Sequence, residues 1–195
     1  MRIFKAKRPG WVALAMLIVA FWLAPACGST DDGGGEAAVV EFQQVMDVGT
    51  IFTPDHLDDI GFKKSRSYDL DGLPGASEAI FGFWRISSGD PIDYEVRFYA
   101  SHADAVELGT ALADEGSGAD AILDDDLATY KEGVKDRRMI VGSGVGGGAR
   151  SGTGPRYGDY AIYGNVVMLC GGAAGEQALD RCEELVNALD EAVGQ

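Results

Sequence analysis

The chain has 195 residues, and subtracting a leader of about 26 leaves enough for one domain with a real core but too few for two. Apolar residues make up 46% of the chain, which excludes wholesale disorder, and its 28 glycines follow no collagen period but predict many turns and loops. Because four of its 16 cations lie in the leader, the mature chain has 12 cations against 31 acidic residues, and a net charge near −19 gives it a surface that repels nucleic acid.

The N-terminus has the pattern of a secretory leader. Residues 1–10 are basic, and residues 11–26 form an uncharged apolar run, too short to span a hydrocarbon core of ~30 Å, which needs about 20 residues. The run ends in LAPAC, with small residues before Cys27, and residues 28–36 read GSTDDGGGE, a flexible polar tether. This end resembles a bacterial lipobox, and the resemblance implies that Cys27 is acylated and anchors the chain to a membrane.

Two alternatives remain open: ordinary cleavage before Cys27 with release of a free secreted domain, and an uncleaved anchor. All three hypotheses place the rest of the chain outside the cytoplasm, at the outer face of the cytoplasmic membrane or in the cell envelope. We expect residues 1–26 to be a lipoprotein signal peptide, residues 27–37 a flexible tether, and residues 38–195 a single globular domain.

The first half of this domain predicts a helix, a hairpin and a second helix. Thr53 and Pro54 are typical of a helix start, and Gly61 ends that short helix. Residues 79–86 and 94–100 are rich in β-branched and aromatic residues, and the turn-forming sequence SSGDP lies between them, so they predict a β-hairpin.

The second strand of this hairpin alternates polar and apolar residues. Glu95, Arg97 and Tyr99 alternate with apolar positions, so one face of the strand is expected to lie in solvent. Ser101 follows directly, and Asp104 three residues later makes an S-x-x-D capping box for the next helix.

The second half repeats the order of hairpin and helix. The predicted elements are a short helix at 120–127, a strand at 138–141, a glycine-rich loop at 142–154, a hairpin at 157–163 and 166–170, and a helix at 176–193. Two such ββα units predict an α+β fold, a two-layer sandwich in which an antiparallel sheet of two hairpins plus an extra strand carries its two main helices on one face.

Cys170 and Cys182 are the two cysteines that remain if Cys27 is lipidated. An even number in an oxidising compartment, and a helix that packs back on the preceding strand, predict a disulfide between them. Closing so short a loop contributes about 3 kcal/mol in the chain-entropy model. The alternative is a pair of free, buried thiols.

A basic segment precedes and follows the glycine-rich loop. The loop satisfies G-x-G-x-x-G but does not open a helix, so a dinucleotide site is disfavoured and a surface loop is the alternative. Arginines flanking free glycine amides could instead bind a carboxylate or phosphate. The candidate anion-binding residues are Arg137, Arg138, Gly144, Gly146, Arg150 and Arg156. The alternative is that the arginines form surface ion pairs with neighbouring aspartates.

Catalytic residues are not expected. His56 and His102 have no metal-ligand spacing, and the chain has no G-x-S-x-G elbow. We therefore assign no catalytic, metal or cofactor-binding residue and expect no cofactor. Aromatic residues gather on both hairpins, where those on an uncovered face would form a platform for a small ligand or a partner chain.

Two stretches, DYEVRFYASHADA at 93–105 and YGDYAIYGNVVMLC at 157–170, resemble uncharacterised lipoproteins of environmental bacteria, notably Chloroflexota. The segment 164–193 is similar to the last strand and disulfide-linked helix of mycobacterial extracellular sensor domains, which implies a surface-exposed sensing or binding module. We therefore expect a lipid-anchored binding or sensing module for an unknown ligand, such as a small anion. The alternative is an envelope structural or assembly protein that holds another protein through its sheet face or edge.

Overall fold

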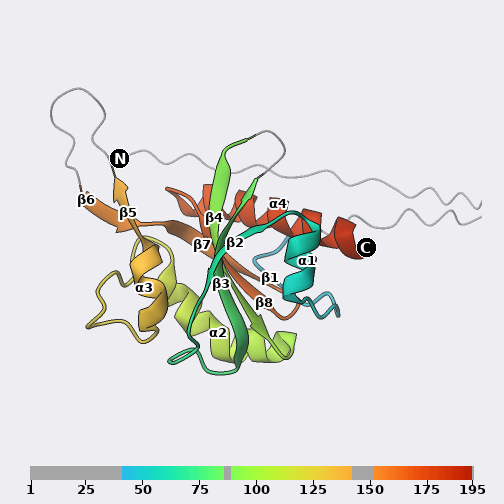
Figure 1. The fold of residues 1–195 in the computed structure, drawn as a ribbon, viewed down its shortest axis with the longest axis horizontal. Helices are drawn as coiled ribbons and strands as arrows, with labels where there is room; N and C mark the ends of the chain where they lie inside the picture. The colour runs from blue at the N-terminus through green and yellow to red at the C-terminus, as the bar shows by residue number, and fades with distance from the viewer. Residues whose placement is uncertain (1–40, 86–88, 142–151, 195) are drawn as a thin grey trace, which may run out of the picture. The chain divides into compact units, whose positions relative to one another are not determined.

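A six-stranded sheet organises the part of the chain that the computed structural model describes, residues 41–85, 89–141 and 152–194 (Figure 1). Its strands, from one edge to the other, are β1 (Val45–Met46), β7 (Tyr157–Tyr163), β8 (Val166–Gly171), β4 (Pro91–Tyr99), β3 (Ala76–Arg85) and β2 (Lys63–Ser67). The helices are α1 (Pro54–Asp59), α2 (His102–Gly116), α3 (Lys131–Arg137) and α4 (Gly175–Val193).

The α+β class and both hairpins are confirmed. β3 pairs with β4 and β7 with β8, and the antiparallel pairing of β4 with β8 joins the two hairpins. β2 adds to β3 at one edge, and β1 runs parallel to β7 at the other. The strand expected at 138–141 is present as β5 (Arg138–Val141), but it pairs with β6 (Gly152–Pro155) in a separate two-stranded sheet. The main sheet therefore gains β1 and β2 rather than the expected strand.

The helices cover both faces of the sheet, which differs from the expected layering. Tyr94, Val96 and Phe98 of β4 pack in the cluster that contains the buried side of α4 and Leu57 of α1. Tyr99, on the other side of the strand, packs against α2. The prediction of a two-layer sandwich with both main helices on one face is thus corrected to three layers. The reason is that every residue of β8 is buried, so both of its faces need a cover.

Local signals succeed where the capping chemistry is strong. Thr53 caps α1 and the Ser101 hydroxyl accepts a hydrogen bond from the Asp104 amide at the start of α2, as predicted. The helix expected at 120–127 does not form. The Asp124 carboxylate accepts a hydrogen bond from the Asp126 amide, and Leu127 is 72% exposed, so this segment makes a turn and buries no apolar stripe.

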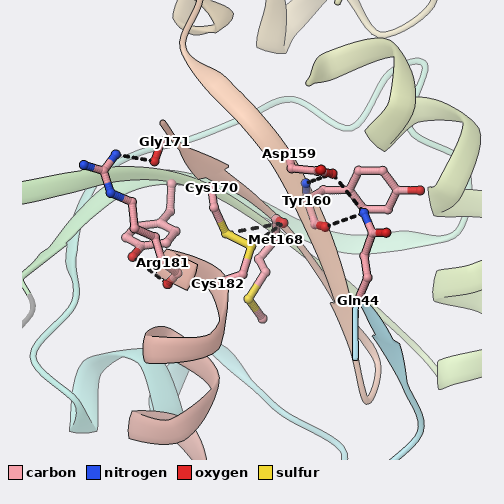
Figure 2. Close-up of a disulfide and its surroundings, with 9 residues drawn as sticks. Gln44, Asp159, Tyr160, Met168, Cys170, Gly171, Arg181 and Cys182 are labelled. Atoms are coloured by element: carbon pink, nitrogen blue, oxygen red, sulfur yellow. Dashed lines mark hydrogen bonds between the residues drawn. A yellow bond between two sulfur atoms is a disulfide. The ribbon is translucent and has the colours of Figure 1, made fainter. Parts of the chain in front are cut away.

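The disulfide between Cys170 and Cys182 is confirmed, and it joins β8 to α4 (Figure 2). Both cysteines are fully buried, with their Cα atoms 5.8 Å apart. Arg181, next to the bridge, donates a hydrogen bond to the Gly171 carbonyl, and its own carbonyl accepts one from the Tyr94 hydroxyl. At the far end of the helix, the Tyr163 hydroxyl of β7 donates to Asp190 at 2.6 Å, so α4 is attached to the sheet by the disulfide and by hydrogen bonds at both ends.

Among the described residues, no helix has the length and apolar character that crossing a membrane requires. The expected signal peptide and tether, with Cys27, lie outside the described residues.

The bridge makes a direct prediction. Replacing Cys170 and Cys182 together by serine should lower the free energy of unfolding by about 3 kcal/mol, because the unfolded chain regains the entropy of an open loop. Urea unfolding of both proteins, with and without dithiothreitol, measures this. Reductant should destabilise only the wild type. Equal stability of the oxidised wild type and the double variant would contradict it.

Candidate functional site

A cleft of about 670 Å³ lies at the free end of the β3–β4 hairpin, at the start of β2. Its volume is within the range of small-molecule sites. Four parts of the chain line it: the junction after α1, the first residue of β2, the end of β3, and the first residue of β4. The lining residues are Gly61, Lys63, Phe83, Trp84, Arg85 and Pro91.

Contacts with neighbouring residues hold the aromatic side chains of the cleft in place. Trp84 donates its indole N–H to the Ile60 carbonyl at 3.1 Å, and Phe83 meets Phe81 edge to face at 5.1 Å between ring centroids. Gly61 turns the chain from α1 into β2 with a φ of +78°, a conformation that favours glycine. Phe83 and Trp84 are consecutive in β3 and face opposite sides of the sheet: Phe83 packs with the cluster of Phe81 and Tyr130, and Trp84 with the cluster of α1 and α4. Both residues line the cleft and remain half-buried rather than covered.

The charged part of the cleft consists of Lys63 and Arg85. Both side chains belong to exposed residues, and neither forms an ion pair within the described part of the chain. By contrast, the neighbouring Lys64 bonds Glu78 at 2.8 Å, and Arg66 lies 3.4 Å from Asp136. The cleft therefore presents two uncommitted cations beside apolar walls, on a chain that is otherwise strongly acidic.

The sequence indicates only some of the residues that line the cleft. Its aromatic residues belong to the group noted on the first hairpin, whereas Lys63 was not singled out. The sequence KKSRS of β2 has no apolar alternation, and its contact with the hairpin end is non-local. No local pattern marks such a junction as a site.

The structure describes three of the six residues predicted to bind an anion. Arg137, Arg138 and Arg156 come together, since the backbone N–H and the guanidinium of Arg156 donate to carbonyls of 136–138. Each guanidinium nevertheless has a carboxylate partner: Glu115 for Arg137, Asp125 for Arg138 and Asp93 for Arg156. Gly144, Gly146 and Arg150 lie outside the described residues. Of the three described arginines, only Arg138 forms the surface ion pair with a neighbouring aspartate that the alternative predicts, because Arg137 is buried with Glu115 and Arg156 pairs with the distant Asp93.

The face of β4 that was expected to be wet is closed. Glu95 and Arg97 are fully buried, and Arg97 donates through Nε to Glu95 Oε1 at 2.7 Å. Arg97 and Arg137 both lie against the ring of Tyr130, with their Cζ atoms 5.5 and 5.7 Å from its centroid. The expectation of a solvent-facing pair is corrected because α2 and α3 cover this side of the strand.

The buried charged cluster consists of Glu95, Arg97, Glu115, Tyr130 and Arg137. The side chains of both arginines are fully buried. Burial alone would lower the pKa of Arg97, but the adjacent Glu95 carboxylate outweighs it, and the pKa of Arg97 is raised. The ion pairs balance the charges of these fully buried arginines. The cluster therefore serves the fold, and the cleft at the hairpin end is the better candidate for a site.

Glu115 shows how strongly this cluster favours the charged forms. Burial raises the pKa of Glu115. Hydrogen bonds from Thr129, from the Tyr130 amide and from Arg137 lower this pKa by a larger amount, so the net shift is downward. The Thr129 amide donates at 2.9 Å and Arg137 at 3.1 Å. A carboxylate with a lowered folded pKa stabilises the protein above its unfolded pKa and loses that contribution as the pH falls.

Both histidines have structural contacts. The Thr53 amide donates to His56 Nδ1 at 3.0 Å in the capping box of α1, and His102 Nδ1 lies 2.7 Å from the Gly164 carbonyl. Within the described ranges, no group of three histidine, cysteine, aspartate or glutamate side chains could hold a metal ion.

We predict that Glu115→Gln removes part of the acid sensitivity of the fold. In the wild type, stability should fall as the pH drops below about 4.5, the usual pKa of glutamate, because the depressed folded pKa makes protonation costly there. The variant should be about 1–3 kcal/mol less stable near neutral pH, since a neutral amide replaces a hydrogen-bonded carboxylate.

Urea unfolding across this pH range measures the slope. Glu107→Gln is the matched control, because Glu107 is an exposed residue of the same helix. Identical pH slopes for Glu115→Gln and the wild type would contradict the prediction.

Comparisons with known proteins match one family model and nothing more. No curated protein and no solved structure matches the chain. The family model matches residues 53–191, from the cap of α1 to the last turns of α4, and so includes every residue of the cleft and of the buried charged cluster. The match spans well over half of the chain, and the protein therefore belongs to the family of unknown function DUF6810.

Proposed function

We propose that this protein is an extracytoplasmic, lipid-anchored binding module, and that its ligand is an anion with an apolar group that binds in the cleft at the end of the β3–β4 hairpin. The observation that carries this proposal is the pairing of uncommitted Lys63 and Arg85 with the half-buried Phe83 and Trp84. The leader, Cys27 and the polar tether support the location.

The two halves of the cleft select the ligand by different forces. Aromatic walls gain free energy from any apolar group that removes them from water, with little regard to its shape. Arg85 can donate two parallel hydrogen bonds to a carboxylate, sulfonate or phosphate, and Lys63 adds a point charge. A ligand that satisfies both halves is amphipathic and anionic.

The acidic surroundings sharpen the preference. A free anion meets repulsion over most of the surface of a mature chain with 31 acidic residues and 12 cations. An anion therefore gains most where cations stand without acidic partners. This reasoning moves the expected anion site from the arginines around the glycine-rich loop to the hairpin end. The alternative function, an envelope assembly protein that binds through its sheet, is favoured by one further feature, the exposed edge strand β2 beside the cleft.

The proposal predicts saturable binding of 1-anilinonaphthalene-8-sulfonate, an aromatic anion, to the folded protein. Arg85→Gln should weaken binding about tenfold, because a charge-assisted hydrogen bond is lost. Lys64→Gln is the matched control, since Lys64 neighbours the cleft residue Lys63 but bonds Glu78. Fluorescence titration gives the dissociation constants. Equal effects of the two substitutions, or equally tight binding of the uncharged N-phenyl-1-naphthylamine, would count against the proposed site.

The proposed anchor has its own test. Cells expressing the chain and fed a labelled fatty acid should incorporate the label into the wild type, and Cys27→Ser should abolish it, because the thiol is the site of acylation. Intact mass spectrometry of the wild type should show a lipid adduct on a chain that begins at Cys27. An unlabelled wild type that retains its initiator methionine would refute the anchor.

A further inference from the structure

We infer that the ligand is an extended acidic segment of another polypeptide, which pairs with the open edge of β2 as an added strand and places an apolar side chain in the cleft. This inference rests on the proposed function and names the chemistry of its ligand.

β2 has an open backbone edge. Its only neighbour in the sheet is β3, and all five of its residues are exposed. In the described part of the chain, no backbone group outside β3 bonds Lys63–Ser67. An edge strand presents unpaired N–H and C=O groups, and an extended peptide can add to them by main-chain hydrogen bonds.

The charge of β2 decides which strand can add. The strand carries Lys63, Lys64 and Arg66 and no acidic residue. A second copy pairing edge to edge would set like charges against one another, which is destabilising. Lysines on an edge strand commonly prevent edge-to-edge pairing of two copies. The same positive charges leave the edge of β2 able to pair with a negatively charged strand. Lys64 already pairs with Glu78, and Arg66 with Asp136. Both cationic side chains nevertheless remain 44% exposed and can bind a second carboxylate.

The edge and the cleft are continuous. Lys63 is the first residue of β2 and also lines the cleft, and it is the register partner of Phe83. A strand of about six residues, at roughly 3.4 Å per residue, would span β2 and end over the cleft. Its terminal apolar side chain would lie against the aromatic walls, while its acidic side chains follow the basic strand. Backbone pairing supplies affinity, and the cleft and the charges supply selectivity.

The experiment uses the full-length protein and a fluorescent, end-capped peptide of sequence FDVEVE. Binding by fluorescence anisotropy, with protection of the β2 amides from hydrogen exchange, is expected. A version of this peptide methylated on alternate backbone nitrogens should bind at least tenfold more weakly, because it loses strand hydrogen bonds. The double variant Lys63→Glu, Lys64→Glu should also bind more weakly. The matched control is Lys131→Glu, Lys135→Glu on α3, whose lysines are also exposed but neither belong to β2 nor line the cleft.

Three outcomes separate the hypotheses. Weakened binding by both the methylated peptide and the β2 variant supports the added strand. Equal binding of the methylated and unmethylated peptides, or no peptide binding while the aromatic sulfonate still binds, overturns the added strand and leaves the proposed cleft intact. Failure of both the peptide and the sulfonate to bind overturns both proposals.

Discussion

Two charges inside the sheet constrain how the rest of the chain packs. Glu95 and Arg97 lie on the same side of the central strand β4 and are fully buried. An unpaired buried charge costs several kcal/mol, so Glu95 and Arg97 pair with each other, while Glu95 Oε2 and Arg97 Nη1 have no hydrogen-bond partner among the described residues. α2 brings Glu115 and α3 brings Arg137, which pair with each other beside the strand pair at 3.1 Å. The two helices thus place a second ion pair next to the buried pair of the strand.

The helix α2 reaches this face because it carries small residues where it crosses β8. A Cβ atom added to Gly109 would come within 2.8 Å of Val167 Cγ2, and one added to Gly116 within 2.6 Å of Leu169 Cδ2. Glycine at these positions permits the close approach that lets Arg137 and Glu115 meet over the strand. The opposite face uses a different solution: an apolar stripe on α4 and a disulfide to β8 hold the helix without buried charges.

These two solutions explain which parts of the fold could be predicted from the sequence. Four features depend on local spacing, and the structure confirms them: the C-terminal helix, both hairpins, the caps of α1 and α2, and the pairing of Cys170 with Cys182. The closed face of β4 could not be predicted, because a strand whose polar residues pair with each other has the same alternation as a strand in water. β2 escaped prediction for the opposite reason: all of its residues are exposed, so burial imposes no pattern on them.

The cleft exists because the two strands of the first hairpin are longer than their neighbours. β3 has 10 residues and β4 has 9, whereas β8 has 6 and pairs with β4 only from Tyr94 onward (Figure 1). Beyond that point β4 has no register partner in β8, and Phe83 and Trp84 remain half-buried. Apolar surface that remains in water beside two cations is typical of a binding site. The covered region of the sheet supplies the rigidity, and the projecting hairpin end supplies the surface at which a ligand can gain most from these residues.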